Sequence, residues 1–137
     1  MIVREFKVKS DEQYELKSDV IAFNGDRSKR VKAVWDTGSD ITYVSNELAN
    51  ELGLDVYGDA SFRTANGISH TTARMLNLRM LGNVNLIDIK AIEADIRPMG
   101  HDVLIGMDIL TLGEFSLSSH DGDTFFSFKI TVDEPTD

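Results

Sequence analysis

The sequence predicts an all-β domain with one or two short helices, and three observations support this prediction. Short stretches rich in β-branched, aromatic or alternating apolar residues recur along the 137 residues, and turn-forming residues separate them. Only two segments have the apolar spacing and the following glycine that are typical of a short helix. Many short strands combined with two short helices favour a β-barrel or a β-sandwich.

The expected strands follow one another closely. Phe6 and Val8 alternate with lysines, and residues 20–23 form an apolar run that stops at an Asn-Gly pair. The basic cluster at residues 27–32 is interpreted as a solvated loop and the start of a strand. Further strands are expected at residues 31–35, 41–44, 61–65, 68–73, 76–80, 84–91, 103–105, 115–118 and 124–130.

Two segments are expected to be helical. Ser45 can cap the first helix, in which Leu48 and Leu52 share one face and Gly53 permits a left-handed end. The second helix is expected within residues 106–112. The rest of the chain shows no comparable helical pattern.

Composition and charge narrow the possible functions. The length fits one domain, expected at residues 1–130, followed by a flexible acidic tail at residues 131–137. A formal net charge of -9 argues against nucleic acid as a partner, because binding to phosphates normally needs a basic surface. The charged N-terminus lacks the apolar stretch of a signal peptide, and no segment approaches membrane-spanning length. A cytoplasmic protein without a membrane partner is therefore expected.

No metal site and no cofactor are predicted. The chain has no cysteine, which excludes disulfides, thiolate metal sites and cysteine nucleophiles. His70, His101 and His120 are scattered without metal-ligand spacing and are expected at surface or loop positions. Asp40 and Asp108 are expected to be solvated or to cap backbone amides.

The tetrapeptide Asp36-Thr37-Gly38-Ser39 lies between two expected strands, at residues 31–35 and 41–44. These strands would hold the aspartate on a rigid turn beside a water-poor cleft. Trp35 should point away from Asp36 and pack in the core, because neighbouring residues of a strand face opposite sides. Four residues alone are a weak signal, and a turn whose aspartate caps an amide is the ordinary alternative.

The tetrapeptide gains weight from two further features that follow it in order. Thr64-Ala65-Asn66-Gly67 lies between two β-prone arms, where Asn-Gly is a strong signal for a tight hairpin. Val103-Leu104-Ile105-Gly106-Met107-Asp108 is an apolar run that ends in glycine. Together with Val34-Trp35-Asp36-Thr37-Gly38-Ser39, these segments resemble the retropepsin-like, or retroviral-type, aspartic proteases over most of the chain. The resemblance implies a closed, dimeric β-barrel and an aspartic-type endopeptidase, a hydrolase of extended polypeptides.

The chemistry of that family needs two neighbouring carboxyl groups. One carboxylate takes a proton from water while the other carboxylic acid donates one to the substrate carbonyl. The chain has a single Asp-Thr-Gly sequence, so the second Asp36 must come from another copy in a homodimer. By resemblance, Asp36, Thr37 and Gly38 form the catalytic set, in which Thr37 locks the two loops together and Gly38 allows close approach.

The resemblance also implies substrate-binding residues and a dimer interface. Ser39 would hydrogen-bond the outer oxygen of Asp36, and Ala65, Asn66 and Gly67 would form the tip of a hairpin lid that closes over the peptide. Terminal strands interleave in family dimers, and residues 1–8 and 125–130 are the candidates for this role.

Two alternatives to the protease remain. The first is a catalytically silent module with the same fold and dimer that binds peptides or acts as a scaffold, because fold alone does not establish activity. The second is an unrelated β-domain in which the tetrapeptide occurs by chance. The retained Asp-Thr-Gly argues against the silent module, since a scaffold has little reason to place two like charges side by side.

Overall fold

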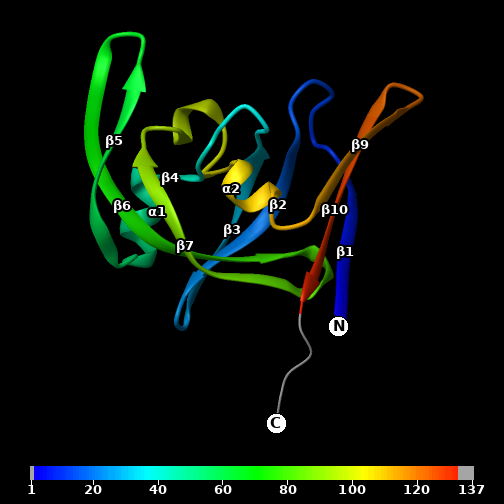
Figure 1. Cartoon of the computed structure of the whole chain (residues 1–137), viewed down its shortest axis with the longest axis horizontal. Coiled ribbons are helices and arrows are strands. Elements are labelled where there is room, and N and C mark those ends of the chain that lie inside the picture. The colour runs from blue at the N-terminus through cyan, green and yellow to red at the C-terminus, as the bar shows by residue number, and fades with distance from the viewer. Residues whose placement is uncertain (1, 133–137) are drawn as a thin grey trace.

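The computed structural model describes residues 2–132, in which six strands close into a mixed β-barrel in the order β2-β3-β8-β4-β7-β6, with β6 pairing back onto β2 (Figure 1). Strands β3 and β8 run parallel, as do β4 and β7, and the other neighbours are antiparallel. The expected all-β fold, a closed barrel with two short helices, is confirmed. The barrel strands are β2 Lys17–Asn24, β3 Arg27–Trp35, β4 Tyr43–Ser45, β6 Gly67–Met80, β7 Val84–Ala94 and β8 Val103–Ile105.

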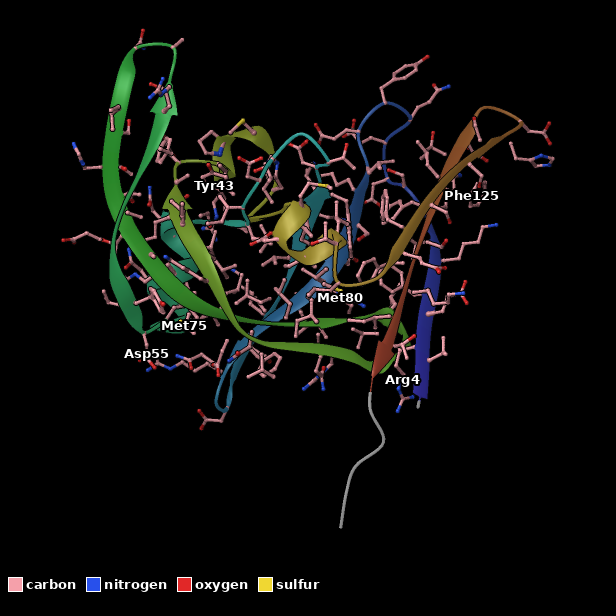
Figure 2. The ribbon with its side chains drawn as sticks, in the orientation of Figure 1. Arg4, Tyr43, Asp55, Met75, Met80 and Phe125 are labelled. Carbon is pink, nitrogen blue, oxygen red and sulfur yellow. The ribbon has the colours of Figure 1, made fainter. Side chains whose placement is uncertain are left out.

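A long hairpin projects from the barrel. Within residues 2–132, strand β5 (Val56–Thr64) pairs only with β6, and the first residues of β6 extend beyond β7, whose pairing starts at Ala73. The amide of Met75 donates to the carbonyl of Asp55 at 2.9 Å, and both residues lie at the foot of the hairpin (Figure 2). The hairpin therefore stands clear of the barrel while its foot is part of the barrel wall.

The two ends of the chain build a separate three-stranded sheet in the order β1-β10-β9. Its strands are β1 Ile2–Lys9, β9 Glu114–His120 and β10 Asp123–Val132, and β1 is antiparallel to β10 along its whole length. The terminal strands that were candidates for interleaving with another copy thus pair with each other within one chain. Met1 and the expected tail residues 133–137 lie outside the described residues, whereas Thr131 belongs to β10.

The first helix forms as expected. Helix α1 spans Asn46–Leu52, the Ser45 hydroxyl accepts the Leu48 amide, and Gly53 adopts a left-handed conformation with φ 59°. The second helix, α2 (Met107–Leu110), is shorter than expected because Thr111 already caps it. Single 3₁₀ turns, η1 (Leu81–Asn83) and η2 (Arg97–Met99), complete the elements. Among residues 2–132, no helix is long and apolar enough to cross a membrane.

Trp35 joins the barrel to the terminal sheet. Its ring lies within 6 Å of the rings of Phe6, Phe126 and Phe128, with centroid distances of 5.5, 5.4 and 5.9 Å, and its Nε1 donates to the Ser18 hydroxyl at 3.0 Å. All of these side chains are buried. Aromatic rings at such distances add to the stabilisation from burial, and the indole N–H keeps a partner. The expectation that Trp35 packs in the core, away from Asp36, is confirmed.

Several expected strand boundaries differ from the structure, two of them in kind. The segments at residues 68–73 and 76–80 form one continuous strand, β6, with an irregularity between Leu76 and Leu78 in its pairing with β7. The basic cluster at residues 27–32 is entirely strand, and ion pairs hold it, such as Lys32 with Asp11 at 2.8 Å and with Asp19 at 2.6 Å. These lysine and arginine side chains point into solvent from a regular strand. A run of charged residues was therefore not a sufficient reason to expect a loop here.

Replacing Phe128 by alanine should lower the free energy of unfolding by about 3 to 5 kcal/mol, because Phe128 is fully buried between the barrel and the terminal sheet. Phe125→Ala is the matched control on the same strand, since Phe125 is only half-buried beneath Lys7. Urea unfolding measures both variants. Equal losses would contradict the two-faced packing of β10.

Candidate active site

The turn that follows β3 holds Asp36 at the end of the barrel. The Asp36 amide donates to the carbonyl of Ile105 on β8 at 2.9 Å, and the Trp35 amide donates to the carbonyl of Leu16 at 2.8 Å. Parallel pairing continues up to Trp35 and Ile105. The backbone is therefore hydrogen-bonded up to and including Asp36. This agrees with the rigid turn that the sequence predicted.

Within the turn, the Asp36 carboxylate faces outward. The Gly38 amide donates to Asp36 Oδ1 at 2.8 Å, and the Ser39 amide donates to the Asp36 carbonyl at 3.3 Å. Asp36 is half-buried, whereas Thr37 and Gly38 are exposed. A Cβ on Gly38 would lie 3.1 Å from Asp36 Oδ1, so glycine leaves the approach to the carboxylate open. One carboxylate oxygen is held by the backbone, and no hydrogen bond to the other oxygen is seen among residues 2–132.

The Ser39 hydroxyl donates to the carbonyl of Ile41 at 2.7 Å, not to the Asp36 carboxylate. Its backbone carbonyl accepts the Met107 amide at 2.7 Å, and the carbonyl of Asp40 accepts the Asp108 amide at 3.2 Å. The start of α2 is thus bonded directly to the Asp36 turn. This contact joins the first and third sequence features that pointed to the site.

Asp108 and Thr42 fasten the other side of the turn. The two oxygens of Asp108 accept the Thr42 hydroxyl at 2.8 Å and the Thr42 amide at 3.1 Å, and the Thr42 hydroxyl accepts the Gly106 amide at 3.3 Å. Asp108 also accepts the Ile109 amide at 3.0 Å, which agrees with the expected capping role. Sequence reasoning missed Thr42, a fully buried threonine whose position in an apolar stretch was the available signal.

Gly106 makes the closest backbone contact in this region. A Cβ there would lie 2.5 Å from the Ile41 carbonyl oxygen and 2.9 Å from that of Ser39. Real side chains do not approach backbone oxygens so closely, and only glycine fits. The sequence pattern that ends in Gly106 is therefore explained by the passage of β8 directly beneath the Asp36 turn.

The predicted hairpin is formed by β5 and β6, with its tip one residue earlier than expected. Thr64 pairs with Gly67, so Ala65 and Asn66 are the two loop residues, and Gly67 opens β6 with φ 119°. The Thr64 hydroxyl accepts the Asn66 amide at 3.2 Å. Ala65, Asn66 and Gly67 are exposed and share the tip, while Asp36 to Ser39 share the turn at the barrel end.

An apolar pocket lies between the hairpin and the strand that follows the Asp36 turn. Phe62 of β5 meets Tyr43 of β4 edge to face, with ring centroids 6.0 Å apart. Figure 2 shows Tyr43 on the side of the barrel nearer the hairpin, whereas Phe125 lies on the terminal sheet. The pocket is lined by Tyr43, Phe62, Ala94, Asp95, Ile96, Met99 and Leu104. Leu104 pairs with Val34, two residues before Asp36, so the pocket is close to the turn along β8.

Arg97 anchors the loop that forms one wall of this pocket. Its guanidinium donates to both oxygens of Glu51 at 2.9 and 3.1 Å and to Asp102 at 2.6 Å, and Asp102 also accepts the Ser45 hydroxyl at 2.7 Å. The hydrogen bond from Arg97, assisted by Lys29, lowers the pKa of Glu51 to about 2. Helix α1 and the loop at residues 97–102 are thereby held together by charge-assisted hydrogen bonds.

His101 lies in a loop, which is one of the two expected positions, but it is buried there and not at the surface. It is 6% exposed, and both ring nitrogens are buried without a hydrogen-bond partner in the described part of the chain. Burial lowers the pKa of His101 below its ordinary value of 6.5, although nearby Glu15 opposes this shift. His70 and His120 are exposed, as expected.

Comparison with known proteins gives one family. A sequence model described as "Aspartyl protease" matches residues 20–109, which include the Asp36 turn, the hairpin and β8. No curated protein matches the chain by sequence. This chain therefore belongs to the aspartyl protease family, and the expected retropepsin-like relationship is confirmed.

Solved structures agree on the fold. A retropepsin-like aspartic protease from Rickettsia conorii superposes with a TM-score of 0.60 at 17% identity, covering 94% of each chain. The EIAV protease, in complex with the inhibitor HBY-793, superposes with a TM-score of 0.58 at 19% identity and covers 76% of this chain and 92% of its own. Both show the same retropepsin-like barrel as this chain.

Gly106→Ala should lower the free energy of unfolding by about 3 kcal/mol, because the new methyl group would overlap the Ile41 carbonyl. Gly58→Ala is the control: a Cβ there meets nothing within 4 Å. It should change stability by less than about 1 kcal/mol. Urea unfolding distinguishes the two variants, and equal effects would contradict the close passage of β8.

His101 should make the protein less stable as the pH falls below 6.5. The unfolded chain protonates histidine near that pH while the buried ring stays neutral, so the unfolded state binds more protons until the lower folded pKa is reached. Unfolding free energies from about pH 8 to about pH 5 should fall in the wild type and fall less in His101→Phe. The control His70→Gln should keep the wild-type dependence of the unfolding free energy on pH. If this free energy falls as much in His101→Phe as in the wild type, the explanation is ruled out.

Proposed function

We propose that the chain is an aspartic endopeptidase whose active site contains two Asp36 carboxyl groups, one from each subunit of a homodimer. The observation that carries this proposal is the half-buried Asp36 carboxylate beside the exposed Thr37 and Gly38, with one oxygen fixed by the Gly38 amide at 2.8 Å. Membership in the aspartyl protease family supports the same chemistry.

Two Asp36 side chains would perform the two proton transfers of peptide hydrolysis. Carboxyl groups at short distance hold one proton between them, and aspartic proteases are the standard example of this coupling. The ionised member takes a proton from the attacking water, and the protonated member gives its proton to the substrate carbonyl oxygen. Because a single chain has only one such turn, this mechanism needs the second copy.

Thr37 would form the contact between the two turns. It is exposed next to Asp36, and no hydrogen bond joins its hydroxyl to another residue in the described part of the chain. A hydroxyl can both donate and accept, so two symmetry-related Thr37 side chains can bond to opposite turns. Gly38 would leave room for substrate and water beside the carboxylates.

The substrate class proposed is an extended polypeptide. The tip residues Ala65, Asn66 and Gly67 would close over the peptide, and their backbone groups would bond to its main chain. The apolar pocket between Phe62 and Tyr43 would take an apolar side chain of the peptide. Ser39, fixed by its bond to the Ile41 carbonyl, would contribute to binding from the floor of the site.

Asp36→Asn should reduce cleavage by at least about a thousandfold, because an amide can neither take nor give the required proton. The assay incubates a diverse peptide mixture with each protein from about pH 4 to about pH 7 and identifies new termini by mass spectrometry.

The control is Asp26→Asn, which removes one exposed acid from the β2–β3 turn and should leave cleavage unchanged. Equal cleavage by the wild type and by Asp36→Asn would exclude the proposed mechanism. A wild-type dimer that binds peptides without cutting them would favour the silent peptide-binding module instead.

A further inference from the structure

One acidic side chain lines the apolar pocket between the hairpin and β4. Asp95 is exposed, and the other lining residues among residues 2–132 are uncharged. Asp95 follows β7 directly, at the centre of a tight turn that the Ile96 amide closes by donating to the Ala94 carbonyl at 3.0 Å. Ala94 and Ile96 line the same pocket, and Ile96 is buried. The turn therefore brings one carboxylate to the mouth of an otherwise apolar pocket.

Two neighbouring strands form the floor of this pocket. Tyr43 of β4 lies directly opposite Leu104 of β8, and residues paired in this way direct their side chains to the same face. Val103 and Ile105 are buried in the core, so Leu104 between them faces away from the core. Phe62 contacts Tyr43 from the hairpin, with ring centroids 6.0 Å apart. The floor thus presents two aromatic rings and aliphatic groups to an occupant.

The acidic residues that flank Asp95 in the sequence are held by arginines. Glu93 accepts a hydrogen bond from Arg74 Nε, and Asp102 accepts one from Arg97 Nε at 2.6 Å. Both arginines are therefore already paired with other carboxylates. Within residues 2–132, no lysine or arginine forms an ion pair with Asp95. The negative charge at the mouth of the pocket is left for a ligand to neutralise.

A long basic side chain of a bound peptide matches this arrangement. Its aliphatic stem can lie along the apolar floor while its charged end stays near water, as lysine and arginine stems commonly do. The cation then lies at the mouth of the pocket, beside the Asp95 carboxylate. Arginine fits better than lysine, because its planar guanidinium can bond both carboxylate oxygens and stack on an aromatic ring. An apolar side chain would fill the floor but leave Asp95 without a partner.

The charge of the whole chain acts in the same direction. With a formal net charge of -9, the protein attracts cationic peptides in general. Asp95 differs from this general attraction because it acts on one position of the peptide, the one whose side chain enters the pocket. Leu104 pairs with Val34, two residues before Asp36, so that position lies close to the Asp36 turn.

We propose that the pocket between Phe62 and Tyr43 selects a basic side chain of the peptide, preferably arginine, and that Asp95 determines this selectivity. The inference rests on the proposed peptidase function and refines the side chain assigned to the pocket there. The substrate class becomes an extended polypeptide that carries a basic residue close to the cleaved bond.

Paired peptides measure this selectivity. In each pair, one position of a short peptide carries either arginine or citrulline, which keeps the length and shape of the arginine side chain without its charge. At one position, the wild type should cleave the arginine peptide with a kcat/KM about fivefold higher, the ratio that corresponds to about 1 kcal/mol for an exposed ion pair. No such preference is expected at positions whose side chains lie outside the pocket.

Asp95→Asn removes the charge and keeps the size of the side chain. It should lower the arginine-to-citrulline ratio at that position to about one. Asp59→Asn is the matched control, because it changes the net charge equally and lies on the same hairpin. Asp59 is an odd number of residues from Phe62 on β5, so it faces the opposite side of the strand. This control should keep the wild-type ratio.

Asp95→Lys reverses the charge and should reverse the selectivity. At the same position, this variant should prefer glutamate to its neutral counterpart glutamine by a similar ratio of about fivefold. A new preference of this kind cannot arise from misfolding, and circular dichroism checks the fold of all three variants. Asp95→Lys without a preference for glutamate would contradict the role given to this residue.

A binding measurement separates the pocket from the chemistry. Fluorescence anisotropy compares labelled arginine and citrulline peptides on Asp36→Asn and on the double variant Asp36→Asn/Asp95→Asn. Arginine-selective binding that the second substitution removes, without cleavage by the wild type, overturns the peptidase while the pocket stands. Cleavage with no arginine preference, or with a preference that Asp59→Asn also removes, overturns the role of Asp95 while the peptidase stands. Neither cleavage nor selective binding overturns both.

Discussion

The close passage of Gly106 under the Asp36 turn is the constraint on which the candidate site depends. A Cβ on Gly106 would lie only 2.5 Å from the Ile41 carbonyl oxygen. The end of β8 can therefore lie this near the turn only because residue 106 is glycine. The bonds from Met107 to Ser39 and from Asp36 to Ile105 depend on that spacing. A larger residue at position 106 would separate the strand that supports the aspartate from the strand that carries it.

A second constraint connects this turn with the rest of the chain. Trp35 lies between the barrel and the terminal sheet, and its ring contacts aromatic residues from both ends of the sequence, such as Phe6 and Phe126. The residue that anchors the core is thus the direct neighbour of Asp36. The terminal sheet therefore packs directly against the residue from which the Asp36 turn begins.

Local patterns predicted much of this fold. Alternation located the strands, Ser45 and Gly53 located α1, and the Asn-Gly pair located the hairpin to within one residue. Patterns of this kind depend only on neighbouring residues. Pairing between distant segments could not be predicted in this way. The pairing of β1 with β10 and the continuity of β6 as one strand depend on contacts between residues far apart in the chain.

The candidate site shows the same division. Asp36, Thr37 and Gly38 were predicted as site residues because they form one contiguous motif, and Asp108 was considered because it lies at the end of a matched segment. The hydroxyl of Thr42 and the buried ring of His101 were not predicted, since the first acts through residues more than sixty positions away and the second depends on what covers it. The Ser39 hydroxyl bonds to the Ile41 carbonyl, a backbone partner that the sequence motif did not indicate.

Strand β6 has a consequence for how the hairpin can move. Because its 14 residues run without a break from the tip into the barrel wall, the hairpin has no loose hinge on that side. The opposite side has one irregularity, between Val56 and Gly58 of β5. The hairpin should therefore bend gradually along its length, with its base fixed in the barrel. Its reach would be tuned by the number of residues near the tip, without altering the base.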